Sequence, residues 1–122
     1  MLLKILNNNL YFYKEVFFKK GYKEVNFYLE TVTDTNNVKR YHNPDGPAII
    51  IWNNNKIKRV EFWINGKRHR KWGPAIAYFE VFEGKLNISS EQWFMNNIEL
   101  TEKEIESTKL KLNRLNKLKK IL

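Results

Sequence analysis

Two short phrases of the sequence share one pattern. Residues 42–48 read His-Asn-Pro-Asp-Gly-Pro-Ala, and residues 69–75 read His-Arg-Lys-Trp-Gly-Pro-Ala. The histidines and the glycines are equally spaced, since 69 − 42 and 73 − 46 both give 27. Similar phrases at a fixed offset indicate a repeat protein. In each phrase Gly-Pro forces a turn before an apolar run of strand length. We therefore predict a chain of repeated β-hairpins.

Hairpin turns separate the strands that follow the first phrase. Asn53–Asn55 should reverse the chain, and a returning strand is expected over residues 57–64, whose even-numbered residues would form one largely apolar face. Asn65-Gly66 then gives the strongest short hairpin signal, because a type I′ turn needs positive φ at both central residues. The second phrase begins just beyond this turn.

The hairpin after the second phrase is longer. Residues 91–97 match residues 60–66, and here the offset is 96 − 65 = 31, four more than between the phrases. We expect the extra residues in a longer turn near Glu83-Gly84-Lys85, because loops tolerate insertions better than strands do.

The N-terminal part predicts a degenerate copy of the same hairpin. Residues 10–18 read as one strand and residues 23–29 as a second, and residues 23–28 match residues 58–63 position by position. The asparagines at residues 7–9 are expected in a polar turn. Residues 31–40 are polar and are expected to form a longer loop.

After Leu100 the apolar spacing changes to that of a helix. Thr101 to Glu104 fits a capping box, and an amphipathic helix of roughly 20 residues is expected. We expect this helix to cover the open edge or an apolar face of the sheet, because so few strands bury little core. Alternatively, its apolar side could form a homodimer, or its basic side could bind an acidic partner or an anionic membrane. The apolar stripe consists of Ile105, Leu112, Leu115, Leu118 and Leu122.

The predicted fold is therefore mainly β: an antiparallel β-meander of hairpin repeats with one C-terminal amphipathic α-helix. We expect a single domain, residues 1–122, which suits a chain of this length. Its parts are a degenerate hairpin at 10–30, repeats at 41–68 and 69–100, and the helix at 101–122.

The amino-acid composition limits the cellular location and the classes of binding partner that we expect. The chain has no cysteine, so disulfides and thiolate metal sites are excluded and an intracellular location is expected. No apolar stretch approaches the roughly 18 residues that span a bilayer, and we expect no membrane partner. A net charge of +9 favours anionic partners without choosing among them.

Residues 62–75 carry a resemblance to a known family. They read Phe-Trp-Ile-Asn-Gly-Lys-Arg-His-Arg-Lys-Trp-Gly-Pro-Ala. This resembles MORN-like β-hairpin repeats, and more closely the His-Arg-x-x-Gly-Pro-Ala repeat proteins of tailed phages and large DNA viruses. Asn43 stands where that family prefers Arg, Trp72 stands where it prefers Asp, and the MORN opening Tyr-x-Gly-x-Trp is missing. The resemblance implies hairpin repeats in a viral accessory or structural protein.

The recurring phrase residues suggest structure rather than chemistry. A residue repeated at each hairpin junction is better suited to hold a turn by hydrogen bonding than to perform one chemical step. No nucleophile, phosphate loop or metal-ligand spacing accompanies the histidines, so we expect no enzyme, no catalytic or metal residues and no cofactor. The predicted structural residues are His42, Gly46, Pro47, His69, Gly73 and Pro74.

Aromatic and basic residues around the second phrase are the candidate partner-binding residues. The first hypothesis is a non-enzymatic module that binds a protein partner through exposed aromatic residues. The second is a nucleic-acid-binding accessory protein, in which cations contact phosphates and aromatic rings support them. A solvated strand face remains the simplest alternative for such charge. The candidates are Arg59, Trp63, Arg68, Arg70, Lys71 and Trp72.

Overall fold

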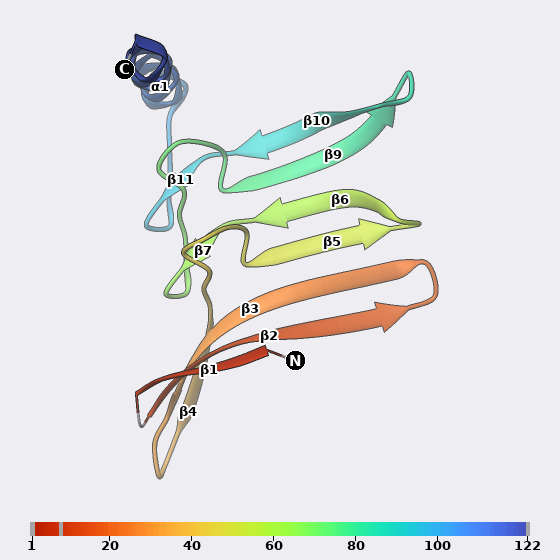
Figure 1. Ribbon diagram of the computed structural model, residues 1–122, viewed down its shortest axis with the longest axis vertical. Helices are drawn as coiled ribbons and strands as arrows, with labels where there is room; N and C mark the ends of the chain where they lie inside the picture. The colour runs from red at the N-terminus through yellow and green to blue at the C-terminus, as the bar shows by residue number, and fades with distance from the viewer. Residues whose placement is uncertain (1, 8, 122) are drawn as a thin grey trace.

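The computed structural model describes residues 2–7 and 9–121, with side chains described for residues 9–120 (Figure 1). It confirms the predicted fold class, because antiparallel strands make up most of the chain as far as residue 99 and one helix follows them. The elements are β1 (Leu2–Asn7), β2 (Leu10–Lys19), β3 (Tyr22–Val32), β4 (Asn37–Tyr41), β5 (Ile49–Asn53), β6 (Lys56–Glu61), β7 (Trp63–Ile64), β8 (Lys67–Arg68), β9 (Ile76–Phe82), β10 (Lys85–Gln92), β11 (Phe94–Met95), β12 (Ile98–Glu99) and α1 (Glu102–Ile121).

Three long hairpins, β2–β3, β5–β6 and β9–β10, lie side by side in one sheet. The strand order is β1-β2-β3-β5-β6-β9-β10, and β4 pairs with the far end of β3. Tight turns with positive φ close the hairpins, at Gly21, at Asn54-Asn55 and at Glu83-Gly84. Asparagine and glycine adopt this conformation most readily, which explains their place at the tips.

A short hairpin follows each long one, and the same backbone bond marks each junction. His42 N–H donates to Phe27 O at 3.0 Å, and His69 N–H donates to Phe62 O at 3.0 Å. Leu100 N–H donates to Trp93 O at 2.8 Å. The short hairpins β7–β8 and β11–β12 and the longer extension β3–β4 therefore occupy equivalent places in three successive units. Asn65 and Gly66 in the β7–β8 turn have φ of 50° and 78°, as a type I′ turn requires.

The expected loop at residues 31–40 is wrong. β3 continues to Val32 and β4 pairs with it, with Thr31 opposite Val38, so only four residues form the turn. Asn36 N–H donates to Thr33 Oγ1 at 2.9 Å and closes it. The polar composition hid this hairpin because β4 is an edge strand whose residues are largely exposed.

The expected continuous strand over residues 57–64 is also wrong. β6 ends at Glu61, and β7 pairs with β8 in a separate small sheet, although Phe62 N–H still donates to Ala75 O at 2.7 Å in register with the β6–β9 ladder. The predicted alternation fails as well, since Glu61 is only 8% exposed and Lys58 is the extra residue of a β-bulge. A bulge changes which side chains share a face.

The four extra residues of the third hairpin lengthen its strands instead of its turn. β9 has seven residues against five in β5, and β10 has eight against six in β6. The turn itself is the two-residue Glu83-Gly84. In the expected polar turn at residues 7–9, Asn7 ends β1 and Asn8 lies outside the described residues.

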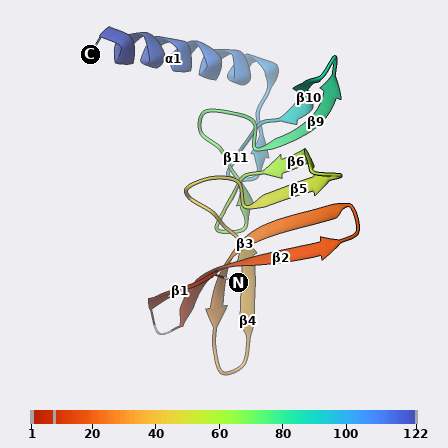
Figure 2. The same ribbon diagram turned by 45° about the vertical axis from the view of Figure 1, so that its right-hand side comes forward.

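Helix α1 has the predicted cap but does not cover the sheet. Thr101 N–H donates to Glu104 Oε1 at 3.1 Å, and Glu104 N–H donates to Thr101 Oγ1 at 3.2 Å. From Lys109 to Lys120 only Leu112 is even half-buried. Figure 2 shows the helix beginning beside β11 and running away from β9 and β10. The expectation that α1 caps the sheet is therefore wrong, because only its first turns touch the last unit.

The core is thin: Tyr13, Val25 and Leu29 are buried in the first long hairpin, and the rest lies near the junctions between units. Ala48 and Ala75, the alanines of the two phrases, are fully buried, and Ala75 clusters with Ile76 and Phe94. Only a residue without a long side chain fits where consecutive hairpins come together. The rest of the sheet is a single layer, and no second layer covers it within residues 9–120.

Candidate functional site

Both histidines of the phrases hold an asparagine turn. His42 Nδ1 accepts a hydrogen bond from Asn65 N–H at 2.9 Å, and His69 Nδ1 accepts one from Asn96 N–H at 3.1 Å. An unprotonated Nδ1 is needed for this bond. Burial, and to a lesser degree the Arg40 guanidinium, lower the pKa of His42. This shift favours the neutral form that the bond requires.

The residue after each histidine closes the Gly-Pro loop. Asn43 Nδ2 donates to Pro47 O at 3.0 Å, and Arg70 donates to Pro74 O at 3.2 Å. Arg70 also stacks on Phe62, with its Cζ 4.0 Å from the ring centre, and burial lowers its pKa. A Cβ added to Gly73 would lie 2.7 Å from Arg70 Cζ. A larger residue at position 73 would therefore have to displace the Arg70 guanidinium from its place across the loop.

An aromatic ladder joins all three units. Ring centres are 5.5 Å apart for Tyr13 and Tyr28, 5.1 Å for Tyr28 and Tyr41, and 5.4 Å for Tyr41 and Trp63. The Arg68 guanidinium continues the ladder, 5.1 Å from Trp63 and 5.3 Å from Phe94. Burial, and then the neighbouring Tyr41, raise the pKa of Tyr28 to about 12. We call this row, from Tyr13 to Phe94, the aromatic ladder.

The ladder and the loops account for most of the candidate partner-binding residues. Trp63 and Arg68 belong to the ladder, and Arg70 closes its loop. Arg59 lies 3.0 Å from Glu61 in an ion pair and 5.8 Å from the centre of the Tyr78 ring. These four side chains already have partners within the fold.

Lys71 and Trp72 remain available in an open groove between the two phrase loops. Residues of the first loop, Asn43 to Gly46, line its other side, together with Arg70. Lys71 Nζ lies 5.2 Å from the Trp72 ring centre. The structure therefore brings three of the six candidates together here and places Arg59, Trp63 and Arg68 elsewhere.

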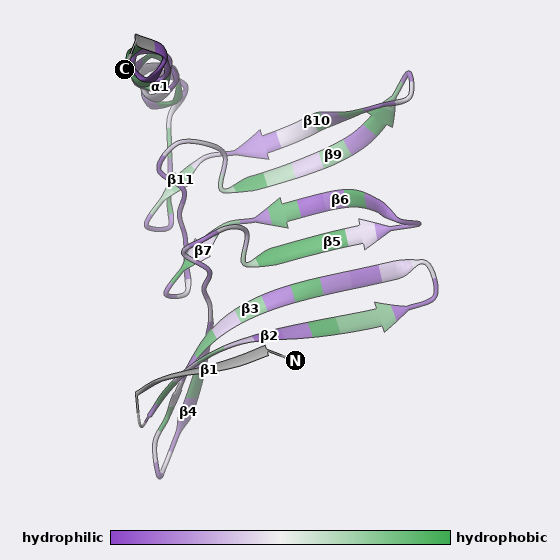
Figure 3. Cartoon of the chain, in the orientation of Figure 1, coloured by the Kyte–Doolittle hydropathy of each residue, from purple (hydrophilic) through white to green (hydrophobic). Residues whose placement is uncertain are grey.

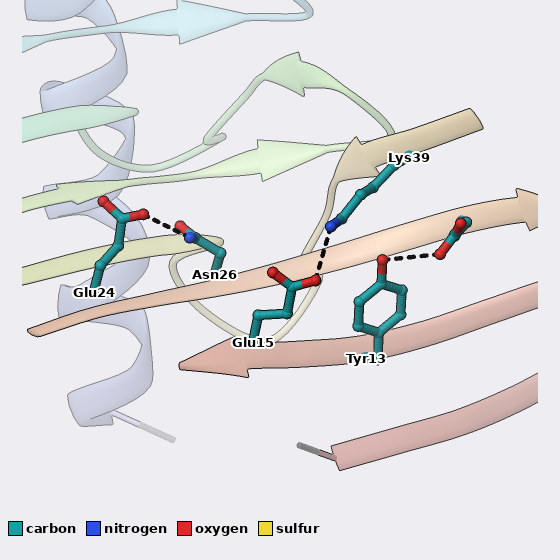
Figure 4. A network of polar contacts seen from close by, with 6 residues as sticks. Tyr13, Glu15, Glu24, Asn26 and Lys39 are labelled. Atoms are coloured by element: carbon teal, nitrogen blue, oxygen red, sulfur yellow. Dashed lines mark hydrogen bonds and ion pairs between the residues drawn. The ribbon is translucent and has the colours of Figure 1, made fainter. Parts of the chain in front are cut away.

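One face of the sheet, which we call the polar face, carries a network of polar contacts, although Phe17 and Phe82 are also exposed on it. Tyr13 donates to Glu30 at 2.8 Å, and Lys39 forms an ion pair with Glu15 at 2.8 Å (Figure 4). Asn26 donates to Glu24 at 2.8 Å on the same face. Polar partners inside the fold thus satisfy much of this surface.

The opposite face carries an unbroken apolar row. Val16 lies opposite Val25, Val25 opposite Ile50, Ile50 opposite Val60, and Val60 opposite Ala77. Directly opposite residues in antiparallel strands share a face, so the row crosses five strands. Figure 3 shows hydrophobic positions on β5, on β9 and near the tip of β2.

Further apolar side chains extend this row toward the tips. Trp52 lies two residues beyond Ile50, and Phe79 and Val81 alternate with Ala77 along β9. Val81 and Leu86, which are opposite each other, are 43% and 50% exposed. We call the whole surface the apolar face: Val16, Phe18, Val25, Ile50, Trp52, Val60, Ala77, Phe79, Val81, Leu86 and Ile88.

Sequence reasoning expected an apolar face only for residues 57–64 and missed its extent across the sheet, because it concentrated on the phrases. The signal was the period-2 alternation Val16, Phe18 in β2 and Ala77, Phe79, Val81 in β9. Two bulges, at Lys58 and Ser89, shift the register of β6 and β10 and weaken the alternation there.

Within residues 2–7 and 9–121, no cluster of His, Cys, Asp or Glu could hold a metal ion. In the same part of the chain, no helix has the length and apolarity needed to cross a membrane. Comparison with known proteins finds no match among protein-family models, curated protein sequences or solved structures.

Proposed function

We propose that the protein is a non-enzymatic interaction module of MORN-like repeats, which binds a protein partner through the apolar face of its sheet. The observation that carries this proposal is the apolar row across β2, β3, β5, β6 and β9, over which residues 9–120 place no second layer, although Val25 and Ala77 within the row are buried. A sheet normally buries its apolar face against another layer. A partner would supply that layer here.

The exposure of the apolar face toward the hairpin tips supports a role in binding. Phe18 is 71% exposed, and Leu86 and Ile88 are each 50% exposed. Burying apolar surface contributes about 25 cal/mol per Å², and contiguous exposed apolar patches mark interaction sites in soluble proteins. The groove at Lys71 and Trp72 is a second, smaller contact surface at the other end of the units.

The proposal is tested by affinity capture from an extract of the native host, with and without nuclease. In one variant of the bait protein, glutamine replaces Val81 and Leu86, which lie opposite each other on β9 and β10. The matched control replaces their neighbours Glu80 and Asn87, which are opposite each other on the polar face, also by glutamine. We expect the wild type and the control to retain a protein that the first variant loses, with no effect of nuclease.

Three results would count against this proposal. Equal capture by both variants would remove the apolar face from binding. Loss of the partner by Trp72→Ala alone would move the site to the groove between the phrase loops. Loss after nuclease treatment would favour nucleic acid as the bridge.

A second candidate function is nucleic-acid binding, and α1 is the feature that favours it. From Ser107 to Lys120 the helix carries six cations and no acid, and its basic residues are exposed. The cations Arg59, Arg68 and Arg70 have partners within the fold and are weaker candidates for phosphate contacts.

Retention on immobilised heparin or DNA tests this candidate. Changing Lys117, Lys119 and Lys120 together to glutamine should lower the salt concentration needed for elution. The matched variant changes the exposed residues Lys67, Lys71 and Lys85 to glutamine and should have a smaller effect. Elution that hardly depends on salt would exclude nucleic-acid binding by either surface.

A further inference from the structure

We infer that the partner segment on the apolar face is an acidic polypeptide, and that the tips of the first two long hairpins receive its carboxylates around Lys23. This inference rests on the proposed function and specifies the chemistry of the partner. It follows from the geometry and the charge of the tips.

The tips of β2–β3 and β5–β6 form one continuous structure. Asn54 N–H donates to Gly21 O at 2.7 Å and joins the two turns. A pocket lies between them, lined by Phe18, Lys19, Gly21, Tyr22, Lys23, Trp52 and Asn55. It opens at the end of the apolar face, because Lys23 lies directly opposite both Phe18 and Trp52.

The ammonium group of Lys23 lies close to two aromatic rings. Its Nζ lies 5.5 Å from the centre of Phe18 and 4.9 Å from the centre of Trp52. Within residues 9–120 it forms no ion pair. The nearest acid in sequence, Glu24, lies on the polar face, where it accepts hydrogen bonds from Tyr22 and Asn26. The ammonium group is thus held in place but has no anionic partner among residues 9–120.

Apart from Glu24, whose side chain lies on the polar face, the charge of these two tips has one sign. Neither residues 16–23 nor residues 52–60 contain an aspartate or glutamate. Four more lysines of these two tips are exposed. The third tip differs, because Glu80 and Glu83 accompany Lys85 there. Clustered cations beside an apolar surface attract carboxylates by Coulomb forces. The four exposed lysines are Lys19, Lys20, Lys56 and Lys58.

This combination favours an acidic polypeptide over two other occupants. A second copy of the chain would bring another +9 and its cationic α1 toward the same lysines. A nucleic acid would need cations along its backbone path, whereas the row from Val16 to Ala77 is aliphatic. A partner segment that alternates apolar and acidic side chains can pack the apolar ones on the row and place the acidic ones beside the lysines of the tips.

Three labelled peptides test the inference in fluorescence anisotropy with the full chain. One alternates leucine and glutamate, one alternates leucine and lysine, and one alternates serine and glutamate. We expect the leucine–glutamate peptide to bind most tightly. Lys23→Glu should weaken its binding by about five- to tenfold and should favour the leucine–lysine peptide.

Matched variants separate a local effect from a general one. Lys117→Glu changes the net charge equally but lies on α1, and it should leave peptide binding nearly unchanged. Lys23→Gln is the milder variant, for use if Lys23→Glu does not fold, and should weaken binding about two- to fivefold. Circular dichroism checks that each variant keeps the strand signal.

Failure of this inference can be distinguished from failure of the proposed function. Equal binding of both leucine peptides would overturn the acidic partner but leave docking on the apolar face intact. Equal binding of the serine–glutamate peptide, or full competition by heparin, would indicate a general anion site and overturn the inference. If no peptide binds while the Val81 and Leu86 variant still loses its captured partner, the acidic partner alone is wrong.

Discussion

His42 and His69 use the same ring nitrogen for the same purpose in successive units. Each accepts the N–H of the first asparagine in the next short hairpin turn, Asn65 or Asn96. The repeated histidine is therefore hydrogen-bonded to the repeated asparagine, although the two residues lie 23 or 27 positions apart in the sequence. A bond from an early residue of one unit to the turn of its short hairpin helps fix the fold of that hairpin.

His42 should make the stability of the fold depend on pH. Its pKa is lowered in the folded state, so the unfolded state binds more protons, and the free energy of unfolding falls as pH drops below about 6.5. Urea unfolding between about pH 7.5 and about pH 5 measures this fall. His42→Asn keeps an acceptor at the δ position and cannot be protonated, so its stability should fall less. Equal slopes for both proteins would contradict the assignment.

Trp63 and Trp72 looked equivalent in sequence, but they should respond differently to replacement. Trp63 lies in the aromatic ladder and donates from Nε1 to Glu61 at 3.0 Å. Trp63→Ala should lower the free energy of unfolding by about 2 kcal/mol or more. Trp72 lines an open groove, and Trp72→Ala should cost about 1 kcal/mol or less. Urea titrations followed by circular dichroism compare the two, and the reverse order would place Trp72 in the core.

At the scale of elements, the hairpin tips show which local signals were reliable. Asn65-Gly66 predicted its turn correctly because the required positive φ is a property of two adjacent residues. The β3–β4 hairpin was not predictable from composition, because its polar residues are stabilised by pairing with a strand that precedes them. The break after Glu61 coincides with the junction bond from His69 N–H to Phe62 O, which closes the β7–β8 hairpin and which no alternation of side chains reveals.

The third tip should be stabilised by one substitution. Glu83 has φ of 51°, a conformation that costs a residue with a long side chain more than it costs asparagine. Asn54, Asn65 and Asn96 have similar φ values at the equivalent turn position. Glu83→Asn should therefore raise the free energy of unfolding by about 0.5–1 kcal/mol. Thermal unfolding measures this, and Glu80→Asn in the strand is the control, which should not stabilise.

At the scale of the whole molecule, the units depend on one another through strand pairing between neighbouring hairpins and through the aromatic ladder. The sequence predicted hairpins, their order and the terminal helix, because these follow from periodicity and turn residues. It did not predict which face of the sheet stays uncovered or that Arg68 lies between two rings. The first depends on pairing between strands and on the bulges at Lys58 and Ser89, and the second depends on contacts between successive short hairpins.

Arg68 should couple the third unit to the second. Its guanidinium lies between Trp63 and Phe94, and each cation–π contact contributes about 0.5–2 kcal/mol. Arg68→Ala should speed hydrogen exchange in β9 and β10 while leaving β2 and β3 nearly unchanged. Lys67→Ala, at an exposed neighbouring position, is the control. Uniformly faster exchange throughout the sheet would show instead that the chain unfolds as one cooperative body.

The junction at Leu100 has a consequence for how the length of this protein is set. Leu100 donates to Trp93 O as His69 donates to Phe62 O, so the acceptor is the same whether a hairpin or a helix follows. A duplicate of residues 69–99 inserted before Leu100 would find a matching bond at each of its ends. Duplication of this segment in the gene would therefore add one hairpin repeat and widen the sheet, and the N-terminal hairpin and the C-terminal helix would not have to change.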